Sequence, residues 1–195
     1  MNNKYTNDKK QVLFIHSAGV QGPMEGSGEL VAFLQNELGD EYKVLYPALP
    51  NPDNPEYVSW KLTLEKELAM LEDDLILVGH SLGGSVILKY LSEHRPVKSI
   101  AGLFLIAAPF WGKKDWEVDE YKLKKDFALD LPSITNIFLY HSIDDPIVPF
   151  SHLLFYSEEL PDAVIRKLKG IRHSFGTGLP ELADDIKSIR VNHIN

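Results

Sequence analysis

Short, uninterrupted apolar runs alternate with longer amphipathic segments along the whole chain, and this alternation limits the possible folds more than any other feature. Each apolar run predicts a β-strand, and the runs cover residues 11–16, 42–46, 75–78, 100–107, 137–140 and 163–168. Strands made almost entirely of Val, Ile, Leu and Phe are typical of sheets that are buried on both faces. The pattern therefore predicts an α/β fold, with a mostly parallel six-stranded sheet and helices on both faces.

The segments between these runs have apolar residues at helical spacing. We expect helices over residues 29–38, 57–71 and 180–190, and a further helix directly after Ser81. Gly39 is a suitable helix stop, and Pro180 suits a first helical turn, where an N–H group would have no partner. Residues 11–195 are therefore predicted to form one domain, preceded by a polar, disordered N-terminus over residues 1–10.

Composition and charge exclude several classes of function. The chain has no cysteine, which rules out disulfides, a thiol nucleophile and zinc sites that need thiolates, and fits a cytoplasmic protein. A formal net charge of -8 opposes binding to nucleic acid and to anionic lipid. No apolar run approaches membrane-spanning length, and the N-terminus lacks the apolar core of a signal peptide. We therefore expect no nucleic-acid partner and no membrane span.

The sequence Gly79-His80-Ser81-Leu82-Gly83 lies between a predicted strand and a predicted helix. The spacing G-x-S-x-G is typical of a nucleophile elbow, a sharp strand-to-helix turn that exposes the serine hydroxyl. The positions two before and two after the serine must be small, because side chains there would collide with backbone. The motif predicts Ser81 as the nucleophile and the N–H of Leu82 as a donor to the oxyanion.

Two other interpretations of this glycine-rich turn are possible. It could be a purely structural connection, or its amide groups could bind a phosphate. However, no lysine follows it as in a P-loop, and the three-glycine dinucleotide fingerprint is absent. The histidines also show no metal-ligand spacing. The sequence therefore implies neither a metal nor an organic cofactor.

An acidic pair, Asp144 and Asp145, follows the fifth apolar run and could supply the carboxylate that a serine nucleophile needs. Catalytic residues in this class of fold occur in the order serine, acid, histidine. Asp145 is the better candidate because Pro146 follows it and restrains the backbone there. The alternative is that both acids form a solvated Asx turn.

His173 is the best candidate for the base among the seven histidines. It alone follows a predicted strand and precedes the last predicted helix, at the sheet edge expected for Ser81 and Asp145. The others lie inside the elbow, at strand ends, at a helix end, too close to Asp145, or beside the C-terminus: His80, His16, His141, His94, His152 and His193. In this assignment His173 removes the Ser81 proton, and the Asp145 carboxylate holds the imidazole in the required tautomer.

The second oxyanion donor is expected in the loop after the first strand, which reads His16-Ser17-Ala18-Gly19. A backbone N–H of this loop lies near the elbow in folds of this kind. We predict that the N–H of Ala18 is this donor, with that of Ser17 as the alternative.

With these motifs the chain resembles the α/β-hydrolase superfamily over nearly all its length. The resemblance rests on residues 16–19, the elbow at residues 79–84, the segment 145–149 and the His173 loop. Its small size is similar to that of short serine hydrolases of the retinoblastoma-binding-protein-nine type, which implies an esterase-like fold without a large lid. Ser17 departs from the pattern, because many relatives have glycine after the histidine, and this affects the geometry of the second oxyanion donor.

The leading functional hypothesis is hydrolysis of a small-molecule carboxylic ester, or of a thioester or amide, through an acyl-enzyme on Ser81. The alternative is a protein-interaction module with a vestigial or secondary active site, since the name of the similar subfamily records a protein partner. A dehalogenase would need a carboxylate in place of Ser81. The aromatic residues in the segment 109–132 could form a wall of the acyl pocket, or belong to the core on a small helix.

Overall fold

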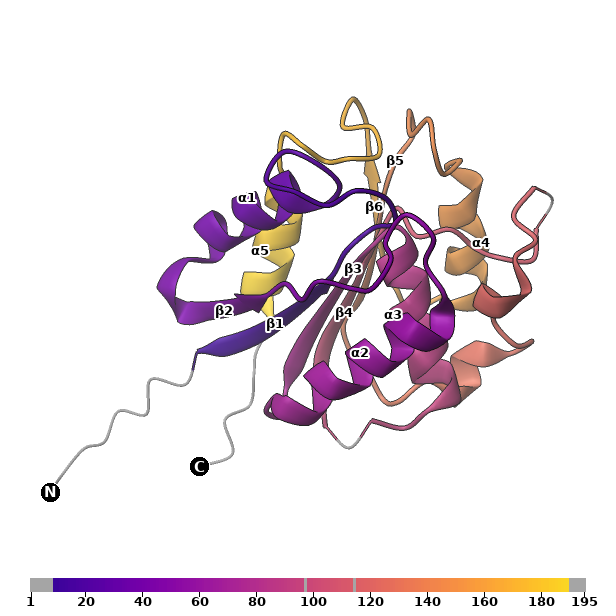
Figure 1. Cartoon of the computed structure of the whole chain (residues 1–195), viewed down its shortest axis with the longest axis horizontal. Coiled ribbons are helices and arrows are strands. Elements are labelled where there is room, and N and C mark those ends of the chain that lie inside the picture. Colours follow the sequence, from indigo (N-terminus) through magenta and orange to yellow (C-terminus); the bar gives the residue numbers. More distant parts are fainter. Residues whose placement is uncertain (1–8, 97, 114, 190–195) are drawn as a thin grey trace, which may run out of the picture.

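A sheet of six parallel strands forms the centre of the part of the chain that the structure describes (Figure 1). The structure is a computed structural model that describes residues 9–96, 98–113 and 115–189. The strand order is β2-β1-β3-β4-β5-β6, and every pairing is parallel. The strands are β1 (Lys10–Ile15), β2 (Tyr42–Leu45), β3 (Leu75–His80), β4 (Ile100–Ile106), β5 (Ile137–Ser142) and β6 (Val164–Leu168). The predicted fold class is confirmed.

Helices cover both faces of the sheet (Figure 1). One face carries α1 (Gly28–Leu38) and α5 (Pro180–Ser188). The other face carries α2 (Tyr57–Met70), α3 (Leu82–Glu93) and α4 (Ser151–Glu159). Each face has its own cluster of buried side chains, so the sheet separates two hydrophobic layers.

The first strand shows why the apolar runs are uninterrupted. Leu13 and Ile15 belong to the cluster under α2 and α3, whereas Val12 and Phe14 belong to the cluster under α1 and α5. All four side chains have no exposed surface. Successive side chains of a strand point to opposite faces, so a sheet covered on both sides needs apolar residues at every position.

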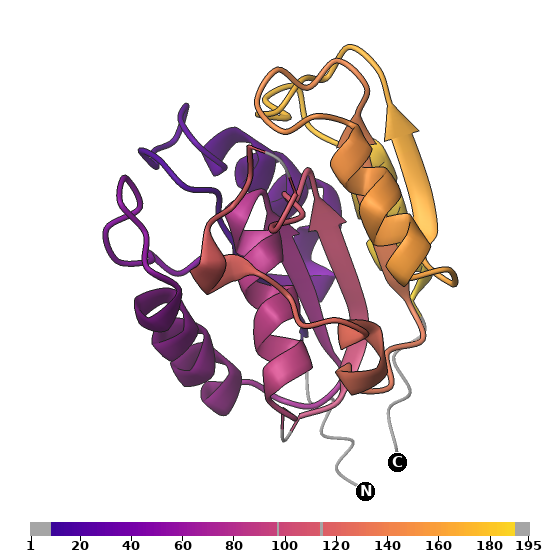
Figure 2. The same cartoon turned by 90° about the vertical axis from the view of Figure 1, so that its right-hand side faces the viewer.

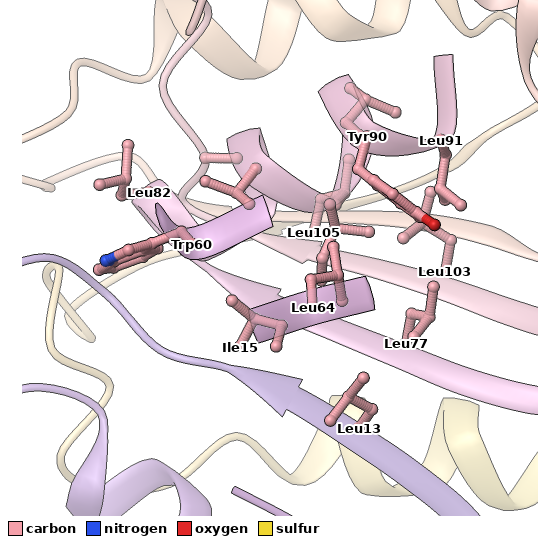
Figure 3. Packing of buried hydrophobic residues seen from close by; sticks show 14 of the residues in the cluster. Leu13, Ile15, Trp60, Leu64, Leu77, Leu82, Tyr90, Leu91, Leu103 and Leu105 are labelled. Atoms are coloured by element: carbon pink, nitrogen blue, oxygen red, sulfur yellow. The ribbon is translucent and has the colours of Figure 1, made fainter. Parts of the chain in front are cut away.

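The packing under α2 and α3 is shown in Figure 3. Trp60 and Leu64 of α2 belong to the same buried cluster as Leu13 and Leu77 of the sheet, and Trp60 and Leu64 are fully buried. Full burial of one large apolar side chain contributes about 1.5–3 kcal/mol relative to exposure. This face of the sheet therefore provides much of the stability that holds the elbow helix α3 in place.

The carboxyl ends of the strands meet at one edge of the sheet, to which the arrowheads in Figure 2 point. From β1 the chain crosses to β2 on one side, whereas β3 pairs with β1 on the other side. Such a reversal opens a crevice between neighbouring strands, and ligands of α/β proteins bind there. The loop after β1 and the elbow after β3 both begin at this point.

Two segments differ from, or add to, the sequence predictions. Helix α4 was not predicted, because its apolar residues are adjacent in sequence rather than spaced by helical turns. The aromatic segment 109–132, for which core residues on a small helix were one of two interpretations, contains two short 3-10 helices, Asp119–Tyr121 and Phe127–Asp130. Of its aromatic residues, Tyr121 and Phe127 are buried in the core. The described part of the β4–β5 connection contains no large lid.

Some predictions concern residues at the two ends of the chain. The disordered N-terminus was predicted for residues 1–10, of which residues 1–8 lie outside the described residues, while Lys10 begins β1. The last helix was predicted to reach residue 190, and α5 ends at Ser188; residues 190–195, including His193, also lie outside. Within the described ranges, no helix has the length and apolar character needed to cross a membrane.

Candidate active site

The turn from β3 into α3 places Ser81 in a backbone conformation that non-glycine residues rarely adopt, with φ at 52° and ψ at -120°. The Ser81 N–H donates to the carbonyl oxygen of Ile106 at 2.8 Å, which ties the turn to the end of β4. Strain of this kind persists only where the surrounding structure holds it, and it occurs often at functional sites. The geometry matches that of a nucleophile elbow.

The glycines on either side of Ser81 allow backbone segments to approach closely. A Cβ atom on Gly79 would lie 2.5 Å from the Cα of Gly84, and one on Gly83 would overlap the carbonyl oxygen of Ile15. These neighbours are backbone atoms and cannot move aside without shifting β1 or α3. Small residues are therefore required at these two positions because β3 and α3 pass close to each other and α3 passes close to the end of β1.

The structure brings Ser81, Asp145 and His173 together at the carboxyl edge of the sheet. Nε2 of His173 lies 3.1 Å from Oγ of Ser81, and Nδ1 lies 2.7 Å from Oδ2 of Asp145. Both distances are within hydrogen-bonding range. Because the carboxylate only accepts, Nδ1 carries the hydrogen, and the neutral ring leaves Nε2 as an acceptor for the Ser81 proton.

The Asp145 side chain is fully buried, and each of its oxygens has partners. Oδ1 accepts hydrogen bonds from the N–H groups of Ile147 at 2.8 Å and Val148 at 2.9 Å. Oδ2 faces Nε2 of His141 at 3.4 Å in addition to His173. Burial alone would raise the pKa of the Asp145 carboxyl, but the hydrogen bonds from His141 and His173 bring it well below its usual range. The carboxylate therefore remains ionised at neutral pH.

The other acid of the pair has a different place. Asp144 is exposed, and its Oδ1 accepts hydrogen bonds from the Ser142 hydroxyl at 2.5 Å and from the Gly170 N–H at 2.8 Å. It links the ends of β5 and β6. The structure therefore pairs His173 with Asp145, while Asp144 stabilises the turn beside it.

Three successive N–H groups follow β1, and the outer two have acceptors within the protein. The Ser17 N–H donates to Oγ of Ser27 at 3.0 Å, and the Gly19 N–H donates to the carbonyl oxygen of Pro52 at 2.7 Å. Among the described residues, the N–H of exposed Ala18 has no acceptor. At the elbow, the N–H of Leu82 belongs to the first turn of α3, where N–H groups have no partner inside the helix. Ala18 and Leu82 thus retain available donors.

His80 is buried beside His173, and the sequence reasoning assigned it no role. Its Nε2 lies 2.9 Å from the carbonyl oxygen of His173, and its Nδ1 lies 2.8 Å from Oγ of Ser27. Burial, followed by the nearby charge of His173, lowers the pKa of His80 to about 3. The ring also packs edge-on against Phe175. No periodicity or spacing in the sequence indicated these contacts between distant loops.

Of the remaining described histidines, His16, His141 and His152 lie near the site, whereas His94 lies at the far end of α3. Nδ1 of His16 lies 2.7 Å from the carbonyl oxygen of Ser17, and the Leu49 N–H donates to its Nε2 at 3.1 Å. His141 contacts the carbonyl oxygen of Val148 with Nε2 at 2.8 Å. His152 and His94 lie in the first turn of α4 and at the end of α3, respectively. These contacts give His16 and His141 packing roles at the ends of β1 and β5.

An aromatic group lies next to the elbow helix. Trp111 donates its Nε1–H to Oγ of Ser85 at 3.0 Å, and the ring of Trp111 packs against that of Trp116. Ser85 is one helical turn beyond Ser81, since its N–H reaches the Ser81 carbonyl oxygen. Phe110, Trp111 and Trp116 are only partly buried. The segment 109–132 therefore contributes residues both to the core and to a partly open aromatic surface.

Residues 32–173 match the model of a serine hydrolase family. The chain is also 28% identical over 127 residues to the YdeN protein of Bacillus subtilis (strain 168); this match covers 64% of the chain and 65% of YdeN, slightly less than two thirds of that relative. The crystal structure of the ydeN gene product from B. subtilis superimposes with a TM-score of 0.77 at 24% identity, covering 92% of this chain and 98% of that one.

More distant structures share the same fold. A serine hydrolase involved in carbazole degradation, CarC, has a TM-score of 0.66 at 15% identity, covering 92% of this chain and 90% of CarC. Arabidopsis thaliana SOBER1 has a TM-score of 0.64 at 16% identity, covering 92% of this chain and 98% of SOBER1. The narrower resemblance to the retinoblastoma-binding-protein-nine type stays a prediction. The family match runs from α1 through the elbow and ends at His173, and the chain belongs to the serine hydrolase family, with the α/β-hydrolase fold.

Proposed function

We propose that this chain hydrolyses small carboxylic esters through an acyl-enzyme on Ser81. The observation that carries the proposal is the continuous chain of hydrogen bonds from the Ser81 hydroxyl through His173 to Asp145, with distances of 3.1 Å and 2.7 Å. A hydroxyl becomes an effective nucleophile only when a positioned base takes its proton.

In the first half of the reaction Oγ of Ser81 forms a bond to the carbonyl carbon of the ester, and its proton passes to Nε2 of His173. The carbonyl oxygen becomes negative and receives hydrogen bonds from the N–H groups of Leu82 and Ala18. The tetrahedral intermediate then expels the alkoxide, which takes the proton from His173 and leaves as the alcohol.

In the second half a water molecule attacks the acyl-Ser81 carbonyl carbon while His173 takes its proton. Collapse of this intermediate breaks the bond to Oγ, returns the proton to Ser81 and releases the carboxylic acid. The buried Asp145 carboxylate stabilises the imidazolium in both halves. It can do so at neutral pH because its low pKa keeps it ionised.

The partly exposed aromatic rings support an apolar acyl or alcohol group in the substrate. Trp111 is anchored one turn from the nucleophile through its hydrogen bond to Ser85, and Phe110 and Trp116 lie beside it. The described residues of the β4–β5 connection form no large lid, and this supports a small substrate. Thioesters and amides pass through the same tetrahedral intermediate and are the alternative acyl substrates.

The test compares turnover of p-nitrophenyl acetate and p-nitrophenyl butyrate by the wild type and by Ser81→Ala. We expect the wild type to hydrolyse at least one of them, and the substitution to lower kcat by about 10⁴-fold or more. A fluorophosphonate probe should label the wild type at Ser81 and leave the variant unlabelled. Turnover of neither ester by the wild type, or an unchanged rate in Ser81→Ala, would overturn the proposal. Absence of labelling would favour an interaction module with a vestigial site.

A further inference from the structure

The side chain of Gln21 bridges several groups of the loop between β1 and α1. Its Nε2 donates to the carbonyl oxygens of Ser17 at 3.0 Å and Gly19 at 2.9 Å. Its Oε1 accepts from the Ser27 N–H at 3.0 Å and from the Tyr46 hydroxyl at 3.0 Å. A side-chain amide has two donor hydrogens and two acceptor lone pairs. The hydrogen-bonding capacity of the Gln21 amide is therefore fully used by groups of this loop and by Tyr46, which follows β2.

The carbonyl group of Ser17 is fixed from two directions. Besides Gln21, Nδ1 of His16 lies 2.7 Å from it, and because a carbonyl oxygen only accepts, Nδ1 carries the hydrogen. The same peptide unit contains the N–H of Ala18. In a planar trans peptide the N–H points opposite to the C=O. Holding the Ser17 carbonyl therefore also fixes the direction of the Ala18 N–H.

The preceding N–H, that of Ser17, is fixed by Ser27, which is completely buried. Ser27 in turn contacts Nδ1 of His80. Nε2 of His80 faces the carbonyl oxygen of His173 and must carry a hydrogen. Burial keeps this imidazole neutral by lowering its pKa, so Nδ1 is an acceptor and the Ser27 hydroxyl donates to it. Ser27 Oγ is then left to accept from the Ser17 N–H.

We propose that Gln21 and Ser27 are positioning residues for oxyanion stabilisation, which fix the peptide between Ser17 and Ala18 so that the Ala18 N–H is directed at the oxygen that becomes negative. The inference rests on the proposed function of Ser81. Through His80, the same hydrogen bonds connect this peptide to the backbone of the base, His173. The loop that carries the Ala18 N–H and the loop that carries His173 are thereby fixed relative to each other.

This role predicts a particular kinetic signature. The oxyanion exists in the transition state and not in the bound ester, so a misdirected donor lowers kcat and leaves KM nearly unchanged. Complete removal of an oxyanion donor costs about 10²–10³-fold in kcat. Loss of the groups that direct the donor should cost less, about 10- to 100-fold. A purely structural role would lower the thermal midpoint without this separation of kcat from KM.

The first variant is Gln21→Glu, which has nearly the same shape but cannot donate to the two carbonyl oxygens. Its control is Gln35→Glu, the same chemical change on the exposed side of α1. We expect a 10- to 100-fold lower kcat for p-nitrophenyl acetate in Gln21→Glu, with KM within about twofold of the wild type. The control should keep the wild-type kcat within about twofold.

The second variant is Ser27→Ala, which removes both the donor to His80 and the acceptor for the Ser17 N–H. Its control is Ser92→Ala, which deletes another buried serine hydroxyl, one that donates to the Lys89 carbonyl oxygen at 2.8 Å in α3. The kinetic expectation is the same as for Gln21→Glu, and thermal midpoints show whether each variant is folded. Wild-type kcat in both folded variants, or a higher KM with unchanged kcat, would overturn the inference.

A measurement on the wild type needs neither activity nor a variant. Nitrogen-15 chemical shifts of the His80 ring should show a hydrogen on Nε2 and none on Nδ1 at neutral pH. A hydrogen on Nδ1 would reverse the bond to Ser27 and refute the inference. If the wild type hydrolyses no ester, the proposed function fails. The His80 tautomer then still tests the directions of the hydrogen bonds from Ser27 to His80 and from His80 to the His173 carbonyl oxygen. If the wild type is active and both variants are unaffected, the inference fails alone.

Discussion

The substitution Asp145→Asn exchanges one carboxylate oxygen for an NH2 group without changing the size of the side chain. The structure decides which way the new amide lies. One oxygen of Asp145 accepts from the N–H groups of Ile147 and Val148, and the other accepts from Nδ1 of His173. The asparagine has only one acceptor oxygen and cannot satisfy both sides.

The two orientations of the amide differ by two backbone hydrogen bonds on one side and by the longer 3.4 Å contact to Nε2 of His141 on the other. With the oxygen toward Ile147 and Val148, both bonds remain. With the oxygen toward His173, the NH2 group faces two N–H donors, and each lost bond costs about 1 kcal/mol or more. A difference of about 2 kcal/mol is about a 30-fold preference for the first orientation. The NH2 group will therefore point at His173.

This orientation reverses the hydrogen on the imidazole. An NH2 group donates to Nδ1 of His173, so the ring hydrogen moves to Nε2, the atom that faces Ser81. A protonated Nε2 cannot take the Ser81 proton. Exchange of the carboxylate for an amide in a Ser-His-Asp triad costs about 10⁴-fold in kcat, and we expect a loss of this size.

The assay is the kcat for p-nitrophenyl acetate, measured for the wild type, Asp145→Asn and Asp144→Asn. The last variant is a matched control, because Asp144 bonds only to Ser142 and Gly170 among the described residues and faces no histidine. It should retain kcat within about threefold of the wild type. An Asp145→Asn enzyme with kcat within tenfold of the wild type would refute the assignment of Asp145 as the orienting acid.

Two further predictions concern stability. Gly83→Ala should lower the free energy of unfolding by about 1–3 kcal/mol or prevent folding, because the new Cβ overlaps the Ile15 carbonyl oxygen. The control in thermal melts is Gly22→Ala, where the Cβ would have only ordinary contacts. Equal midpoints for the two variants would contradict the prediction. Burial lowers the pKa of His80 to about 3 and that of His152 to about 4. The unfolded state therefore binds more protons, and stability falls as pH drops below about 6.5 toward these values, by up to about 1.4 kcal/mol per pH unit for each group. Urea titrations at pH 7 and pH 5 measure this fall, and equal stability at the two pH values would contradict it.

Much of the fold was predictable because burial on both faces leaves a direct trace in the sequence. The apolar runs located every strand of the sheet to within a few residues. Helix α4 was missed because Leu153 and Tyr156, its buried apolar residues, are adjacent to the partly exposed Leu154 and Phe155, which hides the periodicity. The order of the strands across the sheet is likewise absent from local patterns.

Within the site, the sequence by itself located the elbow and the serine at its centre, Ser81. Gly79 and Gly83 are required by contacts within a few residues of the turn or with the adjacent strand, so their spacing around Ser81 is recognisable without coordinates. His173 could also be chosen, because it alone occupies the loop between a predicted strand and the last helix. Each of these features depends on residues close together in the chain, and such patterns can be recognised in the sequence.

Only the tertiary structure decided which of two neighbouring groups faces the site. It paired His173 with Asp145, 28 residues away, and left Asp144 in a turn. It showed that the Ser17 N–H donates to Ser27, whereas the Ala18 N–H has no acceptor among the described residues. Hydrogen bonds have strict distance and angle requirements, and whether two distant groups meet them depends on how the whole sheet places its loops, which no spacing along the chain records.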